Sequence, residues 1–137
     1  MHKQSYQREL PFILPLGGTT RLQVDGVCMA PLLNPGETVV VRRQRLYWPG
    51  DVLVFVGYDG RLYVHRMLGY VLNPWRVRLL TKADRGSRPD MLVQPEHVVG
   101  RVWPHPDGHR VQWSRAMAMR DWAVAVWRLA WQHWRRL

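Results

Sequence analysis

The sequence predicts an all-β domain that ends in one amphipathic helix. Short β-branched or alternating runs, separated by Gly, Pro and Asp-Gly turn signals, fill the chain up to about Trp113. The last segment, 114–137, contains neither proline nor glycine and is rich in helix-forming residues. With 137 residues, 47 % of them hydrophobic, the chain is long enough for one folded domain. We therefore expect an extended arm over 1–20, a β domain over 21–113 and a helix over 114–137.

The N-terminal half is expected to alternate between strands and proline turns. In the arm, two prolines and a Gly-Gly pair prevent a long helix. Two strands follow, RLQVDGV and TVVVRR, the second strongly β-branched. The segment between them, APLLNPGE, has two prolines and a glycine and is predicted to be a turn or a single helical turn.

The C-terminal half of the β domain is expected to begin with a hairpin. Asp59 and Gly60 separate the strands DVLVFVG and RLYVHRMLGYV, a spacing typical of a tight hairpin turn. The alternating run WRVRLLTKA, the polar loop DRGSRPD and two short closing strands, HVVGRVWPH and HRVQW, come next. The short connections favour a mainly antiparallel sheet.

Charge and composition limit the classes of partner. The chain has 20 Lys and Arg against 10 Asp and Glu, a net charge of +10 that favours an anionic membrane or an acidic partner. Zinc spacing, a Gly-rich phosphate loop and an RNA-binding signature are all missing from the sequence, so nucleic acid is an unlikely partner. Neither a signal peptide nor a spanning apolar run is evident. We expect a cytoplasmic protein, soluble or peripheral to the inner face of a membrane.

The predicted helix carries more apolar surface than one small core needs. Ser114 is its expected N-cap. Two apolar ridges follow helical spacing, one formed by Met119, Trp122, Ala123, Val126 and Ala130, and one by Trp127, Trp131 and Trp134, with arginines between them. The helix can pack on its own sheet, or it can bind an anionic membrane surface or a partner protein. Both alternatives can hold for different faces.

One thiol and one histidine are the candidates for chemistry. Cys28 is the only cysteine, so it has no disulfide partner within the chain. A thiol attacks a carbonyl carbon when a base takes its proton, and His65 is the candidate base. Asp84 and Asp90 are candidate acceptors for the imidazole N–H. Taken alone, these residues fit a buried Cys28 and a surface His65 better, and the other histidines are also expected at the surface.

Five short segments resemble, in order and spacing, the sequence boxes of the signal peptidase I and LexA-like superfamily of serine peptidases. The segments are GVCMAPLLNPGE, WPGDVLVF, VHRM, TKAD with the PD behind it, and VVGRV. Together they extend from Val24 to Val102, over half of the chain. The resemblance implies a compact, coiled, mainly antiparallel β catalytic core, to which the C-terminal helix is added.

The resemblance implies roles for the residues around Cys28. Cys28 stands where these peptidases have the nucleophilic serine, and its backbone N–H would be one oxyanion donor. Met29 and Pro31 match the Met-x-Pro that follows this serine. Together with Arg66 they are the candidates for the substrate cleft.

The resemblance also implies a base and an orienting acid. His65 stands at the general base of the Ser-His branch of the superfamily. Asp84 and Asp90 match the two acids of the fourth box, and one of them should orient His65. We favour Asp90 slightly, because Asp84 can instead brace the loop.

The chain departs from the family pattern at several positions. Besides Cys28, Ala83 replaces the usual glycine and Glu37 replaces the usual aspartate, and we expect no membrane anchor of the signal-peptidase kind. The implied activity is limited proteolysis of a peptide or protein precursor by a cysteine nucleophile, with no metal or cofactor. The alternative is an inactive signal-peptidase-like binding module that acts through its basic surface and C-terminal helix.

Overall fold

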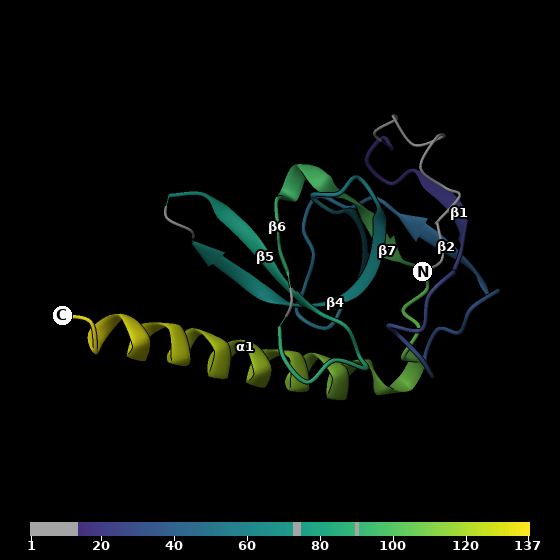
Figure 1. Cartoon of the computed structure of the whole chain (residues 1–137). Helices are drawn as coiled ribbons and strands as arrows, with labels where there is room; N and C mark the ends of the chain where they lie inside the picture. Colours follow the sequence, from purple (N-terminus) through teal and green to yellow (C-terminus); the bar gives the residue numbers. More distant parts are fainter. Residues whose placement is uncertain (1–13, 73–74, 90) are drawn as a thin grey trace.

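A seven-stranded antiparallel sheet and one long C-terminal helix make up the fold (Figure 1). The computed structural model describes residues 14–72, 75–89 and 91–137. The strand order is β1-β2-β7-β3-β4-β5-β6, and the sheet is not closed. The strands are β1 (Thr19–Gln23), β2 (Thr38–Arg42), β3 (Val52–Val56), β4 (Leu62–Leu72), β5 (Val77–Lys82), β6 (Met91–Val93) and β7 (Val98–Val102). The helices are the 3₁₀ turns η2 (Pro95–His97) and η3 (Gly108–Arg110) and the α-helix α1 (Val111–Trp134).

The core lies on both sides of the central strand β3. Val52 and Val54 pack into one apolar cluster, and Leu53 and Phe55 into a second. All four side chains are buried, which agrees with the unbroken apolar run VLVF in the sequence. A strand buried on both faces requires the sheet to coil around it.

Strand β4 connects the part of the sheet that contains β3 to the part that contains β5. Its first residues pair with β3, in the hairpin predicted at Asp59 and Gly60, where the Gly57 N–H donates to the Arg61 carbonyl (2.8 Å). Its last residues pair with β5, with a register shift between Met67 and Gly69. Arg66 takes part in both ladders, opposite Val52 on β3 and Lys82 on β5. It therefore stands where β4 passes from one half of the sheet to the other.

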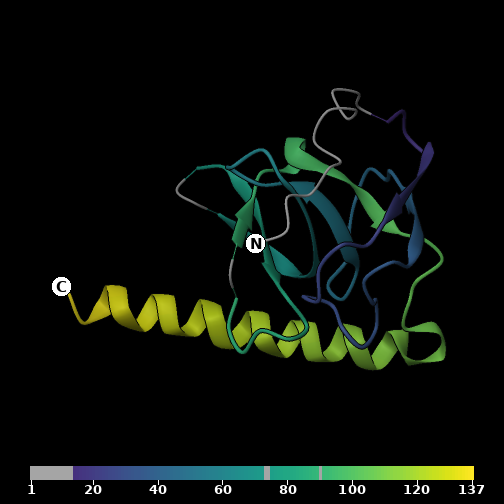
Figure 2. The ribbon, with the colours of Figure 1, turned by 45° about the vertical axis from the view of Figure 1, so that its right-hand side comes forward.

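Helix α1 packs against β4 and β5 with one face. Ala118 is buried against Leu68 and Leu80. The Trp122 indole Nε1 donates to the Tyr70 carbonyl (2.8 Å), and its ring occupies the space that a side chain at Gly69 would need. In both views the C-terminal part of α1 extends beyond the β-sheet (Figures 1 and 2). The expectation that the helix packs on its own sheet is confirmed for this face.

Several expectations about the fold are corrected. The class is α+β rather than all-β, because α1 forms a layer of its own on the sheet. The segment HRVQW is not a closing strand but a 3₁₀ turn and the start of α1. In this segment only Val111 and Trp113 alternate with polar residues, and Trp113 is exposed, so a strand here would bury little apolar surface. The helix therefore begins at Val111, before the predicted residue 114. Consequently Arg110 rather than Ser114 is the N-cap, without a side-chain hydrogen bond.

Removing the Trp122 side chain should destabilise the domain. We expect Trp122→Ala to lower the free energy of unfolding by about 2–3 kcal/mol, because it removes buried ring surface and the bond to the Tyr70 carbonyl. The matched control is Trp127→Ala on the exposed side of α1, for which we expect a change within about 0.5 kcal/mol. Urea denaturation measures both, and equal values would contradict the described packing of α1.

Candidate functional site

Cys28 and His65 line one cleft. It encloses about 120 Å³, and it lies between β1, the turn after it, and the β3–β4 hairpin. Its walls are mostly apolar and are formed by Leu22, Gln23, Val24, Asp25, Gly26, Met29, Val54, Leu62, Tyr63 and Val64, in addition to the two candidate residues. The fold thus brings the predicted nucleophile and the predicted base, far apart in the sequence, to the same cavity.

The exposures of Cys28 and His65 are the reverse of those expected if Cys28 were a buried structural thiol and His65 a surface residue. Cys28 is exposed, whereas His65 has only 4 % of its surface accessible. The interpretation of Cys28 as a buried thiol and His65 as a surface residue is therefore wrong. A thiol that reaches solvent beside a histidine held in the core can meet a substrate and a base together.

Two aromatic rings, which stack on each other, hold His65 in place. It lies on β4 opposite Leu53, with its ring centroid 5.7 Å from Phe55 and 5.8 Å from Tyr63, in edge-to-face contact with both. Edge-to-face packing restricts rotation of the imidazole. Asp90, the acid favoured to orient His65, lies outside the described residues.

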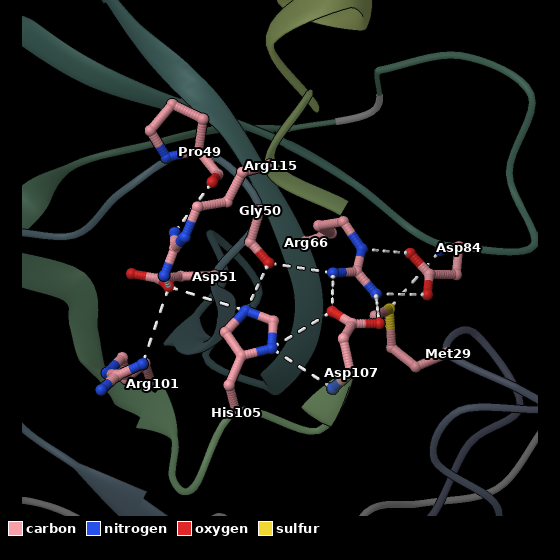
Figure 3. Close-up of polar contacts among 10 residues, drawn as sticks. All are labelled: Met29, Pro49, Gly50, Asp51, Arg66, Asp84, Arg101, His105, Asp107 and Arg115. Atoms are coloured by element: carbon pink, nitrogen blue, oxygen red, sulfur yellow. Dashed lines mark hydrogen bonds and ion pairs between the residues drawn. The ribbon is translucent and has the colours of Figure 1, made fainter. Parts of the chain in front are cut away.

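Asp84 pairs with Arg66. The Arg66 Nε donates to Asp84 Oδ1 (2.8 Å) and Nη2 donates to Oδ2 (2.9 Å), a bidentate ion pair (Figure 3). This is the bracing role that we considered for Asp84 as the alternative to orienting the histidine. The bond joins β4 to the loop that follows β5.

Two cleft candidates lie elsewhere. Arg66 does not line the cleft, and its guanidinium instead binds Asp84 and Asp107. Pro31 is exposed and is also absent from the cleft walls. Of the three residues expected to contact substrate, only Met29 is a wall residue of this cleft.

The C-terminal segment completes the surroundings of Arg66. The Arg66 Nη1 donates to Asp107 Oδ2 (2.6 Å) and to the Gly50 carbonyl (2.9 Å). Two carboxylates and a carbonyl therefore enclose the Arg66 side chain, which is only 12 % exposed (Figure 3). Burial alone would lower the pKa of Arg66, but the bonds to Asp84 and Asp107 outweigh it and raise this pKa above its usual value. The guanidinium therefore stays charged at any pH at which the protein is folded.

The loop fixed by Arg66 supports the turn that carries Cys28. The Asp84 N–H donates to Met29 Sδ (3.4 Å), and the Arg85 N–H donates to the Cys28 carbonyl (3.1 Å). Arg66 follows His65 directly in β4. One strand thus holds the predicted base with one residue and, through the next, the loop that supports the predicted nucleophile.

A second buried charge lies behind this site. Asp51 is buried and accepts a bond from the Trp48 N–H (2.8 Å), and its Oδ1 lies 3.1 Å from Arg115 Nη2 and 3.8 Å from Arg101 Nη1 (Figure 3). Arg115 also donates to the Pro49 carbonyl (2.9 Å). These contacts attach the first turn of α1 to the β-sheet next to Arg66.

His105 is a largely enclosed member of this network, with 11 % of its side chain exposed, rather than the surface residue we expected. Its Nδ1 accepts from the Asp107 N–H (3.2 Å) and its Nε2 lies 3.1 Å from the Gly50 carbonyl, an arrangement that fits the neutral ring with its proton on Nε2. Burial lowers the pKa of His105, Arg115 lowers it further, and Asp107 and Asp51 oppose the shift.

Sequence reasoning missed Asp107, His105 and Arg115 as neighbours of the site. They follow the last family-like box, so the resemblance gave no signal for them. Within residues 14–72, 75–89 and 91–137, no three His, Cys, Asp or Glu side chains gather closely enough to hold a metal ion. Of the helices in that part of the chain, none combines the length and apolar character needed to cross a bilayer.

In comparisons with known proteins, the chain matches no protein-family model and no curated protein sequence. The case for its function therefore rests on the site itself and on the residues that form it.

Removing Arg66 should destabilise the domain strongly. We expect Arg66→Ala to lower the free energy of unfolding by about 3 kcal/mol or more, because Asp84 and Asp107 would be left without their shared cation. The control is Arg61→Ala, whose exposed side chain lies 3.8 Å from Asp59 and should contribute less than about 0.5 kcal/mol. Similar losses for both variants in urea denaturation would show that the enclosed pair is not special.

His105 should make stability depend on pH. The folded pKa of His105 is lowered, so the unfolded chain binds more protons below its ordinary pKa of about 6.5. The free energy of unfolding should therefore fall as the pH drops below this value, and His105→Gln should reduce that fall. The control is His97→Gln, at an exposed position, which should keep the slope of the unsubstituted protein. Denaturation at a series of pH values measures the slopes, and identical slopes for all three proteins would refute this role.

Proposed function

We propose that the protein is a cysteine peptidase with a signal-peptidase-like catalytic core, which performs limited proteolysis of a peptide or protein precursor. The observation that carries the proposal is the shared cleft of an exposed Cys28 and a buried His65. The order of the five family-like segments supports the same roles for both residues.

The proposed reaction proceeds through a thioester. His65 takes the thiol proton, and the Cys28 sulfur attacks the scissile carbonyl carbon while the Cys28 N–H stabilises the oxyanion. The C–N bond breaks as His65 returns the proton to the leaving amine, which leaves an acyl group on Cys28. Water, deprotonated by His65, then attacks the thioester, releases the new carboxyl group and restores the thiol.

The free strand edge next to His65 suits an extended substrate. Strand β5 pairs with β4 only from Arg66 onward, so the outer edge of Leu62–Val64 has no partner among the described strands. A peptide laid along this edge could form main-chain hydrogen bonds while one side chain enters the cleft. The apolar walls formed by Val24, Met29 and Val54, and the small volume, favour a small apolar side chain there.

The reactivity of Cys28 toward iodoacetamide tests the proposed pair. We expect His65→Ala to slow alkylation at neutral pH by about tenfold or more, because the imidazole that would accept the thiol proton is removed. Mass spectrometry of the modified chain measures the rate. His97→Ala is the matched control and should react like the unsubstituted protein.

Two outcomes would count against the peptidase. Slow labelling that is indifferent to His65 would remove the activated nucleophile. Retention of all biological function by Cys28→Ala would favour the binding module instead, because that function needs the surface and not the thiol.

A further inference from the structure

The outer face of α1 carries a continuous ridge of tryptophans. Trp127, Trp131 and Trp134 have exposed fractions of 63 %, 47 % and 71 %. At 3.6 residues per turn they lie within about 60° of one another, on the side opposite Ala118 and Ala125, which face the sheet. Packing on the sheet therefore leaves this tryptophan ridge uncovered in the described structure.

The three rings form one surface rather than three separate side chains. The ring centroids of Trp127 and Trp131 are 5.9 Å apart with an interplanar angle of 18°, and those of Trp131 and Trp134 are 6.1 Å apart at 29°. Trp113 and Val124 lie on the same side of the helix and are also exposed. Arg120 interrupts this side between Trp113 and Val124, so the continuous apolar strip, from Val124 to Trp134, extends along about 15 Å of α1.

The charges beside the ridge are all of one sign. After Asp121 the chain contains no further acidic residue, and Asp121 itself pairs with Lys82 (3.3 Å) on the sheet side. Arg128, Arg135 and Arg136 follow it and are exposed. Arg128 and Arg135 flank the ridge on one side, and Arg136 follows at the end of the helix, so this end of α1 offers aromatic rings and positive charge to a surface that is both apolar and anionic.

We infer that this face binds the surface of an anionic lipid bilayer, with α1 lying in the plane of the headgroups. Indole rings prefer this interface, because the ring enters the acyl boundary while the N–H remains hydrated. The arginines would contact lipid phosphates, and their long stems allow the helix to sink below the headgroups.

A lipid surface fits these features better than a second copy of the chain. Two copies that buried their ridges against each other would bring together two sets of arginines, on chains that each carry a net charge of +10. A bilayer removes this repulsion, because it supplies negative charge along the full length of the strip. The inference does not depend on the proposed peptidase, because none of its residues line the Cys28 cleft.

Co-sedimentation of the full chain with vesicles tests the inference. We expect binding to phosphatidylcholine vesicles that contain phosphatidylglycerol, weakened by added salt, and little binding to vesicles of phosphatidylcholine alone. The combined variant Trp127→Gln/Trp131→Gln/Trp134→Gln should bind at least about tenfold more weakly. Circular dichroism should show an unchanged fold, because the three side chains contact solvent.

Two further variants separate the contributions. Arg128→Gln/Arg135→Gln/Arg136→Gln should reduce binding by about a hundredfold, since each arginine near an anionic surface contributes about fivefold. Trp75→Gln is the matched control: Trp75 is 92 % exposed but lies in the β4–β5 connection, so this variant should bind like the unsubstituted chain.

Three results would overturn the inference. The first is no sedimentation with anionic vesicles. The second is equal binding by the tryptophan-ridge variant and Trp75→Gln. The third is a dimer in sedimentation velocity that the ridge substitutions dissociate, without any binding to lipid, because the ridge would then be an interface between two copies.

Discussion

The ion pairs of Arg66 with Asp84 and Asp107 are the interaction on which the arrangement of the site depends. Arg66 stands where β4 changes partner from β3 to β5, and its side chain bonds the loop after β5 and the segment before α1. Because both carboxylates share one guanidinium, neither segment can move without leaving a largely buried charge unpaired. The geometry of the Cys28 turn follows from this, since the Asp84 loop donates to Met29 and Cys28.

The peptide sequence places His65 and Arg66 side by side, and strand geometry then separates their tasks. Alternation turns the two side chains to opposite faces of β4; His65 lines the cleft, and Arg66 enters the ion-pair network. The proposed base and the residue that fixes the position of the nucleophile are thereby held by the same two hydrogen-bonded ladders. A cysteine in this position also suits the proposed chemistry, because a thiol gives up its proton to a histidine more easily than a hydroxyl does.

Helix α1 performs two tasks with opposite faces. Its first turn supplies Arg115 to Asp51, and Trp122 binds the Tyr70 carbonyl, so this face belongs to the structure of the domain. The outer face carries the exposed, stacked tryptophans, on which the proposed binding to a lipid surface rests. The two sequence interpretations of this segment were compatible, because a long helix that packs on a narrow sheet must leave its other face exposed.

Local pattern alone determined the elements of this protein. Alternation and β-branching specified β2 and β3, the Asp59-Gly60 pair specified the hairpin, and the run without proline or glycine specified α1. The same sequence named Cys28 and His65 as the residues capable of chemistry. Each of these features depends on residues close together in the chain, which is why it can be read from the sequence.

Only the tertiary structure decided exposure and pairing. The sequence alone favoured a buried Cys28, and nothing in it indicated that His105 would be withdrawn from solvent or that Asp107, 41 residues away, would bind Arg66. Such contacts depend on which faces meet when β4, the loop after β5 and the start of α1 come together. Local propensity also failed at residues 109–113, where alternation predicted a strand and the structure has a 3₁₀ turn and the start of α1. The burial available in the folded domain, rather than alternation, determined this choice.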